Sequence, residues 1–336
     1  MKFYVVALIL FFIGLSVVSI RVQKVYAAYT SDVIINSDGS ISPDTAPIQR
    51  NGNIYTLTSN VSTSGNWLFI NRSNIIFDGA GHKVESIFDY NAIALSSKNN
   101  VTIKDVEIRK FNYAFSLQSC SNIIIVKNTL LDNNIGVGST SCFNLNIAYN
   151  TIRTKTDRNY GIDLQYCSDC VLARNNISDG VAGIALERSG NNFVVGNSIS
   201  GCGFVAGTGW GILIGDAGNN RILYNQFYYN LMHVRTLSQN IWSDGAIGNY
   251  WDDYHTKHPS ATITNGIWNT AYTIDANNVD NQPVASLDRL QFPPLIIVPE
   301  FPSLTIIPLF IILTLLIIML RTRCHLPSIA QISSLN

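Results

Sequence analysis

Residues 122–130 read Asn-Ile-Ile-Ile-Val-Lys-Asn-Thr-Leu, and close variants of this phrase recur along the chain. Successive copies are separated by 22, 22, 25, 22 and 28 residues. The copies begin at Asn100, Asn122, Asn144, Asp169, Asn191 and Asn219. A nearly fixed period with occasional insertions is the signature of a solenoid, in which each repeat forms one coil.

The spacing of apolar residues within a copy selects the type of solenoid. Apolar side chains fall at every second position, as in Ile123 and Ile125 or Ile162 and Leu164. This alternation is typical of strands, and no copy shows the spacing of an amphipathic helix. A coil of about 22 residues is suited to three short strands. The sequence therefore predicts an all-β protein, a right-handed parallel β-helix.

A ladder of asparagines is expected inside this solenoid. Five copies carry an Asn at the same place in the phrase, and equivalent residues of neighbouring coils stack about 4.8 Å apart. The predicted ladder consists of Asn128, Asn150, Asn175, Asn197 and Asn225. Val106 holds the equivalent place in the preceding copy, so the ladder should start one coil later. We interpret these amides as structural.

Three cysteines share a second register position, two residues before a repeat begins. Cys120, Cys142 and Cys167 should therefore stack on successive coils. Neighbouring coils are close enough for a disulfide in an oxidising compartment. A ladder of buried free thiols is the other interpretation.

The composition excludes some partners. Only 13% of the residues are charged and the formal net charge is zero. The chain therefore lacks the basic surface that nucleic-acid binding requires. Low charge combined with many small polar residues suits an extracellular solenoid.

Apolar segments at both ends suggest export and anchoring. Lys2 is followed by an apolar run to Ile20 and a Val-Tyr-Ala cleavage pattern, as in a secretory signal. Residues 304–320 form a second apolar run, followed by Arg321, which predicts a membrane span with a cytoplasmic tail. We expect a protein on the outer face of the cell membrane. The expected segments are 1–28 signal, 29–65 N-terminal cap, 66–254 β-helix, 255–298 C-terminal cap and linker, 299–323 anchor and 324–336 tail.

Several motifs resemble a known family. The turn at 77–82, Phe-Asp-Gly-Ala-Gly-His, and the phrase at 248–254, Gly-Asn-Tyr-Trp-Asp-Asp-Tyr, resemble NosD-type and carbohydrate-binding/sugar-hydrolase (CASH) β-helix proteins over about residues 32–290. Residues 299–302, Pro-Glu-Phe-Pro, resemble the PEF-type sorting signal of archaeal surface proteins. The resemblance implies the fold, but the fold serves many functions. Relatives place an acidic, metal-binding loop after this phrase; residues 255–268 carry no carboxylate, so we assign no metal and no cofactor.

One face of the solenoid gathers groups suited to a binding or catalytic site. Asp163 and Glu187 should lie diagonally on adjacent coils, at a spacing that glycosidases use for an acid and a base. Alignment of the repeats puts His233 in the column of Asp163 and Arg235 in that of Glu187. The other candidate binding residues are Tyr160, Tyr166, Phe204, Trp210 and Asp216.

Three functional hypotheses remain open. The first is a non-catalytic envelope scaffold or carbohydrate-binding protein whose partner is a polysaccharide or cell-envelope glycan. The second is a polysaccharide-active hydrolase, lyase or epimerase that uses Asp163 and Glu187. The third is a copper accessory protein of the NosD type, for which His255 and His258 are the closely spaced histidines.

Overall fold

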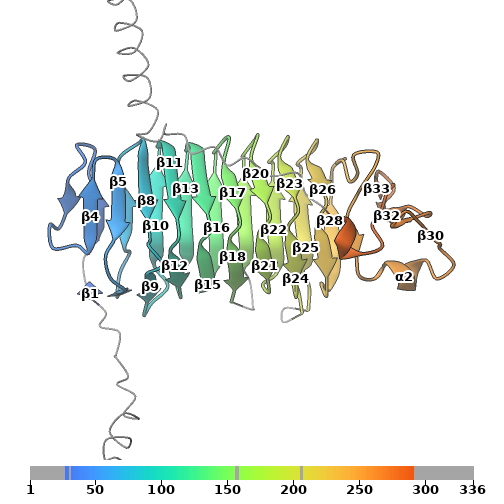
Figure 1. Ribbon diagram of the computed structural model, residues 1–336, viewed down its shortest axis with the longest axis horizontal. Helices are drawn as coiled ribbons and strands as arrows, with labels where there is room; N and C mark the ends of the chain where they lie inside the picture. Colours follow the sequence, from blue (N-terminus) through green and yellow to red (C-terminus); the bar gives the residue numbers. More distant parts are fainter. Residues whose placement is uncertain (1–26, 30–31, 156–158, 205–206, 291–336) are drawn as a thin grey trace, which may run out of the picture. The chain divides into compact units, whose positions relative to one another are not determined.

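The computed structural model describes residues 27–29, 32–155, 159–204 and 207–290 (Figure 1). All of them belong to the first of two units, Met1–Phe292. The predicted membrane anchor, its tail and nearly all of the predicted signal segment lie outside the described residues. Within those residues, no helix is long and apolar enough to cross a membrane.

Three parallel sheets run along the stack of coils, and each coil contributes one strand to each sheet (Figure 1). Sheet 1 contains, in spatial order, β1 (Ala27–Tyr29), β6 (Val61–Thr63), β9 (Lys83–Ser86), β12 (Glu107–Arg109), β15 (Thr129–Asn133), β18 (Thr151–Thr154), β21 (Asn176–Ser178), β24 (Ser198–Ser200), β27 (Gln226–Tyr228) and β29 (Tyr250–Trp251). Sheet 2 contains β28 (Met232–Thr236), β25 (Trp210–Gly215), β22 (Ala182–Glu187), β19 (Tyr160–Gln165), β16 (Ile135–Thr140), β13 (Tyr113–Gln118), β10 (Asn91–Ser96), β7 (Leu68–Ile70), β2 (Val33–Ile35) and β3 (Ile41–Ser42). Sheet 3 contains β26 (Arg221–Leu223), β23 (Phe193–Val195), β20 (Val171–Ala173), β17 (Asn146–Ala148), β14 (Ser121–Val126), β11 (Asn99–Lys104), β8 (Ile75–Asp78), β5 (Ile54–Leu57) and β4 (Ile48–Asn51). This architecture confirms the predicted all-β parallel solenoid.

The first strands begin the solenoid rather than only covering it. β2 pairs in parallel with β7, and β6 pairs in parallel with β9. Two short antiparallel pairs, β2 with β3 and β4 with β5, close this end. Paired outer edges leave fewer free strand groups to which another chain could add.

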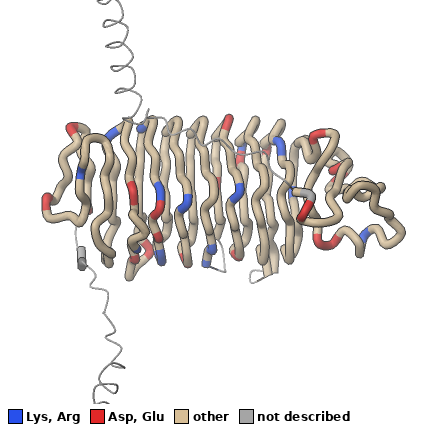
Figure 2. Tube along the Cα trace, viewed as in Figure 1, with Lys and Arg blue, Asp and Glu red and all other residues tan. Residues whose placement is uncertain are grey.

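The core consists of apolar side chains that stack from coil to coil. One column of sheet 3 is fully buried and runs Phe77, Ile103, Ile125, Ile147, Leu172, Val194 and Ile222. Charged residues are sparse along the coils (Figure 2). Burial of these columns is the main favourable term that holds neighbouring coils together.

The first residue of each repeat phrase has a left-handed backbone. Asn122 and Asp169, for example, have φ of 52° and 57°. Asn and Asp tolerate this conformation better than other residues with a Cβ. The same conformation occurs at Asn100, Asn144, Asn191 and Asn219. The corner of the coil therefore explains why every copy starts with Asn or Asp.

The predicted asparagine ladder is present and fully buried. The Asn128 backbone N–H donates to Oδ1 of Asn150 at 2.9 Å, and each later member repeats this bond with the next coil. Val106 donates to Oδ1 of Asn128 at 3.1 Å, so the ladder starts at the expected coil. It continues beyond Asn225 to Asn249.

The cysteine column is also present. The backbone N–H of Cys120 points to Sγ of Cys142 at 3.3 Å, and that of Cys142 points to Sγ of Cys167 at 3.4 Å. The described cysteines are free and buried. The structure therefore agrees with the thiol ladder, and Ser189 continues it on the next coil.

A cap covers the C-terminal end of the coils. It contains α2 (Tyr254–Lys257), the hairpin of β30 (Ile263–Thr264) and β31 (Ile267–Trp268), the hairpin of β32 (Tyr272–Asp275) and β33 (Asn278–Asp280), and the 3₁₀ helix Leu287–Arg289. Oδ2 of Asp280 accepts the Asn249 N–H at 2.7 Å and the Trp251 indole N–H at 3.0 Å. A cap carboxylate thus terminates the asparagine ladder.

Candidate functional site

The outer face of sheet 2 brings together the predicted carboxylate pair. Asp163 on β19 is in register with Ala185 on β22, and Gln165 is in register with Glu187. The two carboxylates therefore lie on adjacent strands, offset by two residues, as the repeat alignment predicts. Their surroundings differ, because Asp163 is 7% exposed whereas the Glu187 side chain is 51% exposed.

Asp163 has the electrostatics of a protonatable carboxyl group. Burial raises its pKa, and the nearby charge of Glu187 raises it further, against the lowering effect of a hydrogen bond from Gln165. The ring of Tyr113 lies across Gly138, where a Cβ would come within 2.5 Å of it. A buried acid beside an exposed carboxylate is the asymmetry that acid–base chemistry uses.

Aromatic residues border the same face. Tyr113, Tyr160 and Trp210 share one register column, which also contains Ile135 and Ala182. The guanidinium of Arg235 lies 5.4 Å from the centre of the Trp210 ring. Aromatic rings and charged groups spaced along several coils of one face suit an extended ligand.

The remaining predicted binding residues are dispersed. Tyr166 lies at the corner after β19, where the Arg188 guanidinium sits 5.4 Å from its ring centre. Asp216 lies at the corresponding corner after β25 and interacts electrostatically with Arg188. Phe204 lines a cavity near the C-terminal cap instead. The outer face therefore gathers only part of the predicted set.

The predicted alignment of the last strand is wrong by two residues. Leu213 is in register with Arg235, so Arg235 and not His233 continues the column of Asp163. His233 follows Gly211 in a different, buried column. Alignment relied on a small residue near the start of each strand, and β28 has none.

From the coil of Ala92 to that of Gly211, the column that His233 joins is made of small residues. Its members there are Ala92, Ala114, Gly136, Gly161, Gly183 and Gly211. A Cβ added to Gly161 would lie 2.5 Å from the carbonyl oxygen of Gly183 on the next coil. Large buried side chains stand only at the two ends of this run in the described coils: Trp67, which precedes Ala92 in register, and His233, after which no further strand of sheet 2 follows.

The His233 imidazole faces the carboxylates of two adjacent residues that follow strand β29. Its Nε2 lies 2.9 Å from Oδ1 of Asp252 and 3.3 Å from Oδ1 of Asp253. The His233 side chain is only 5% exposed, and its Nδ1 is buried without a hydrogen-bond partner. Within the part of the chain that the structure describes, these three residues form the one group whose ligand atoms converge within 4.8 Å.

Ring packing fixes the imidazole. The ring centres of Phe227 and Trp251 lie 5.9 and 5.8 Å from that of His233. Trp251 is itself stacked between Phe227 and Tyr272, at 4.4 and 4.2 Å. The backbone N–H of Tyr229 donates to Oδ2 of Asp252 at 2.7 Å, which fixes that carboxylate as well.

The second carboxylate is held by the cap. The Tyr272 hydroxyl donates to Oδ1 of Asp253 at 3.0 Å, and the Lys257 ammonium lies 2.9 Å from Oδ2. Burial alone would raise the pKa of Asp253, but the hydrogen bonds from His233 and Lys257 outweigh it and hold the pKa well below its usual range. Asp253 is therefore ionised at neutral pH.

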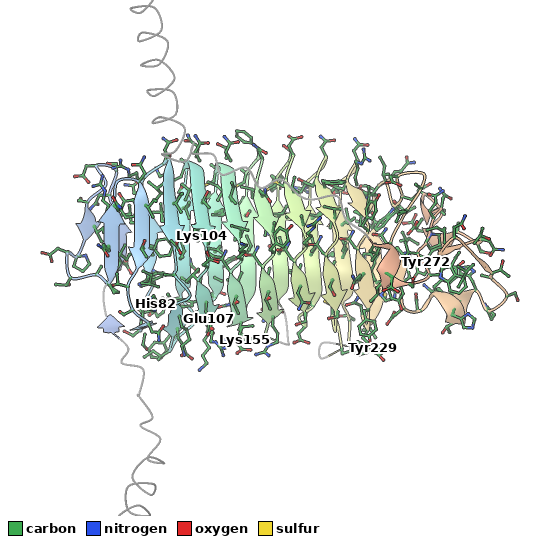
Figure 3. The ribbon with its side chains drawn as sticks, in the orientation of Figure 1. His82, Lys104, Glu107, Lys155, Tyr229 and Tyr272 are labelled. Carbon is green, nitrogen blue, oxygen red and sulfur yellow. The ribbon has the colours of Figure 1, made fainter. Side chains whose placement is uncertain are left out.

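These groups line a cavity of about 440 Å³ at the C-terminal end of the solenoid. Tyr229 and Tyr272 mark this end in Figure 3. Met232 and Phe204 contribute an apolar wall. One imidazole and two carboxylates are a donor set that divalent transition metals accept.

The histidines predicted for copper do not form such a group. His255 is exposed and stacks on Trp268, with ring centres 6.1 Å apart, whereas His258 packs on Tyr254 at 4.9 Å. Two features of the sequence pointed to the observed group. His233 stands where the preceding coils have Gly or Ala, and the adjacent Asp252 and Asp253 follow about 20 residues later. Sequence reasoning missed it because Asp252 and Asp253 were treated as part of a family phrase.

The fold and this cluster define a parallel β-solenoid with a His–carboxylate pocket at its C-terminal end. The family model described as "Periplasmic copper-binding protein (NosD)" matches residues 82–256, just over half of the chain. The chain therefore belongs to the NosD family.

Solved structures with similar coils include two kinds of protein. The periplasmic alginate epimerase AlgG is 14% identical, with a TM-score of 0.43, over 66% of this chain and 72% of that chain. The surface protein and adhesin PfbA of Streptococcus pneumoniae is 10% identical, with a TM-score of 0.33, over 59% and 81%. No curated protein sequence matches the chain.

Proposed function

We propose that this protein acts outside the cytoplasm and binds a divalent transition-metal ion, copper in the first instance, through His233, Asp252 and Asp253. The observation that carries this proposal is the convergence of three ligand atoms within 4.8 Å around a buried imidazole. The family description supports copper as the first ion to test. Among divalent first-row ions, Cu²⁺ also binds nitrogen and oxygen donors most tightly.

A bound metal ion would offset the electrostatic repulsion between the two carboxylates of the site. Two carboxylates lie within 3.3 Å of one imidazole nitrogen, and both have the hydrogen-bond partners that fix them. A cation between these donors would compensate their mutual repulsion at short range. The aromatic stack around His233 excludes water from one side, which strengthens this attraction.

Copper titration of the full-length protein by calorimetry tests the proposal. We expect His233→Ala and Asp252→Asn each to weaken Cu²⁺ binding at least tenfold, because each removes one donor. The double variant His255→Ala/His258→Ala is the matched control and should bind as the wild type does. Loss of binding in the control, with unchanged binding in His233→Ala, would refute the assignment.

A second candidate function is glycan binding on the outer face of sheet 2. The observation that favours it is the column of Tyr113, Tyr160 and Trp210 beside the buried Asp163. Aromatic rings present apolar faces that stack on sugar rings. In this view the protein is a surface scaffold or a carbohydrate-binding protein.

A glycan array with reducing-sugar measurements separates binding from catalysis. Binding that is lost in Trp210→Ala, without sugar release, supports a non-catalytic role. Sugar release that disappears in Asp163→Asn or Glu187→Gln supports an acid–base enzyme instead. The absence of any array signal would exclude this second candidate for the glycans tested.

A further inference from the structure

Lys257 holds the side of the metal pocket opposite His233. Its ammonium nitrogen lies 2.9 Å from Oδ2 of Asp253 and 2.5 Å from the Tyr272 hydroxyl oxygen. It also lies 4.3 Å from the centre of the Tyr272 ring. The Lys257 ammonium group is therefore the hydrogen-bond donor to both Oδ2 of Asp253 and the Tyr272 hydroxyl oxygen.

Asp253 is shared between two cationic or hydrogen-bonding groups. Its Oδ1 faces Nε2 of His233 at 3.3 Å, whereas its Oδ2 faces Lys257. A divalent ion bound to Oδ1 would lie a few ångströms from the ammonium charge. Like charges at such a distance repel strongly in a partly buried site. Lys257 and the ion therefore compete for one carboxylate.

Lys257 is placed so that it can leave. It is the last residue of α2, a single helical turn, and its side chain is 48% exposed, whereas that of His233 is 5% exposed. An ammonium group on a flexible stem can move into water without burying or orphaning a charge. The pair with Asp253 is half exposed, and such pairs contribute little to stability.

We propose that Lys257 is the built-in counter-cation of the site: it closes the pocket when no metal is bound and moves into solvent when a divalent ion enters. Its departure frees Oδ2 of Asp253 and the Tyr272 oxygen as additional donors. This inference rests on the proposed metal site and adds to it the residue that sets its affinity. Lys257 is a regulating residue and not a ligand.

The variant Lys257→Leu tests the competition directly. Leucine keeps an apolar stem near the Tyr272 ring, removes the charge and, unlike methionine, adds no sulfur donor for copper. Titrated with copper(II) and zinc chloride, the full-length variant should bind both ions at least tenfold more tightly than the wild type. Lys155→Leu is the matched control, because Lys155 pairs with Asp89 at 2.8 Å, outside the site. Equal or weaker binding by Lys257→Leu would overturn the proposal.

A second measurement uses the unmodified protein, so that it does not depend on a variant that folds. Lysine acetylation by an N-hydroxysuccinimide ester is followed by mass spectrometry with and without zinc chloride. Metal binding should release the Lys257 ammonium and raise its labelling rate severalfold, while Lys155 stays constant. A rate at Lys257 that falls or does not change when the metal binds would overturn the proposal.

The two proposals fail in different ways. Wild-type protein that binds neither ion, together with a Lys257→Leu variant that also binds neither, refutes the metal site itself. Wild-type binding that depends on His233 but not on the Lys257 charge leaves the metal site intact and refutes only the role of Lys257.

Discussion

The buried asparagines do a task that no apolar side chain can do. At a corner of each coil a backbone N–H points along the stack, where no strand partner faces it. The Asn150 side chain accepts the Asn128 N–H and donates from Nδ2 to the Ile125 carbonyl at 2.9 Å. One amide thus satisfies two backbone polar groups of the preceding coil, which would otherwise be costly to bury.

Replacement of one ladder member should therefore destabilise the protein strongly. We expect Asn150→Ala to lower the free energy of unfolding by about 3 kcal/mol, because it leaves a buried N–H and a buried carbonyl without partners. Asn134→Ala is the control: Asn134 is only half-buried and bonds to Asn112 at 3.1 Å, so its loss should cost less than about 1 kcal/mol. Urea unfolding measures both, and equal losses would contradict the ladder's role.

Gly248 is required by the same structure for a steric reason. A Cβ at this position would lie only 1.8 Å from Oδ1 of Asp280. Gly248→Ala should displace that carboxylate from the Asn249 and Trp251 donors and lower the free energy of unfolding by about 2–4 kcal/mol.

Gly65→Ala provides the steric control for this change. No atom lies within 4 Å of the Cβ that would be added at Gly65. Its urea midpoint should stay close to that of the wild type. If the Gly248→Ala protein were as stable as the Gly65→Ala protein, the Asp280 carboxylate could move aside for the added Cβ at little cost, which would contradict this prediction.

At the scale of elements, the cap attaches to the last coil through a buried carboxyl group. Burial raises the pKa of Asp280 to about 6, although the hydrogen bonds from Asn249, Trp251 and Gln282 act in the opposite direction. The side chain is fully buried. The native state therefore holds a proton on Asp280 at a pH where the unfolded chain has already lost it.

This difference predicts how stability depends on pH. The unfolded pKa is about 3.9, so the contribution of the protonated group is complete below pH 4 and is lost as the pH rises to about 6. The change is at most about 3 kcal/mol. The difference in unfolding free energy between wild type and Asp280→Asn, measured from pH 4 to 7, should shift by this amount. A constant difference would mean that Asp280 does not titrate in this range.

Elements whose residues follow the period could be predicted from the sequence, and irregular ones could not. The period fixes the phase of the strands, so the Asn128–Asn225 and Cys120–Cys167 columns were correct. A second buried ladder, Asn192, Asn220, Asn240 and Asn278, was missed because its steps of 28, 20 and 38 residues have no common period. It crosses from the coils into the cap, and only the three-dimensional path of the chain brings its last member into line.

The candidate site was predicted only in part for the same reason. Asp163 and Glu187 lie within regular coils, and their diagonal placement follows from the repeat. The His233 cluster joins the last coil to the cap, so its contacts depend on a turn that the repeat does not encode. The misalignment of β28 also hid the fact that His233 is buried.

At the scale of the whole molecule, the metal pocket joins the solenoid to its cap. His233 lies on β28 of the last coil, whereas Asp253 and Lys257 belong to the chain that leads into the cap. In solenoids each coil contacts only its neighbours, so stability added at one end spreads only if the coils unfold together.

Ligand binding can therefore report on cooperativity. With Cu²⁺ at a free concentration of about one hundred times its Kd, the free energy of global unfolding should rise by about 2.7 kcal/mol. The measurement is the urea midpoint with and without the ion, and a chelator should reverse the shift. At the same ion concentration, the shift in His233→Ala should fall to about 1.4 kcal/mol or less, because binding is at least tenfold weaker. A shift restricted to hydrogen exchange of the cap, with an unchanged global midpoint, would show that cap and coils unfold separately.

The small-residue column of sheet 2 has a consequence for how such a chain can lengthen. Duplication of a coil upstream of β28 inserts another Gly or Ala between two others, and the backbones still approach closely. Duplication of the coil that contains His233 would place an imidazole where the next coil's carbonyl must lie. Growth by repeat duplication is thus easier among the coils that carry Gly or Ala in this column than at the His233 coil, so the pocket and its cap move outward together as the molecule gains coils.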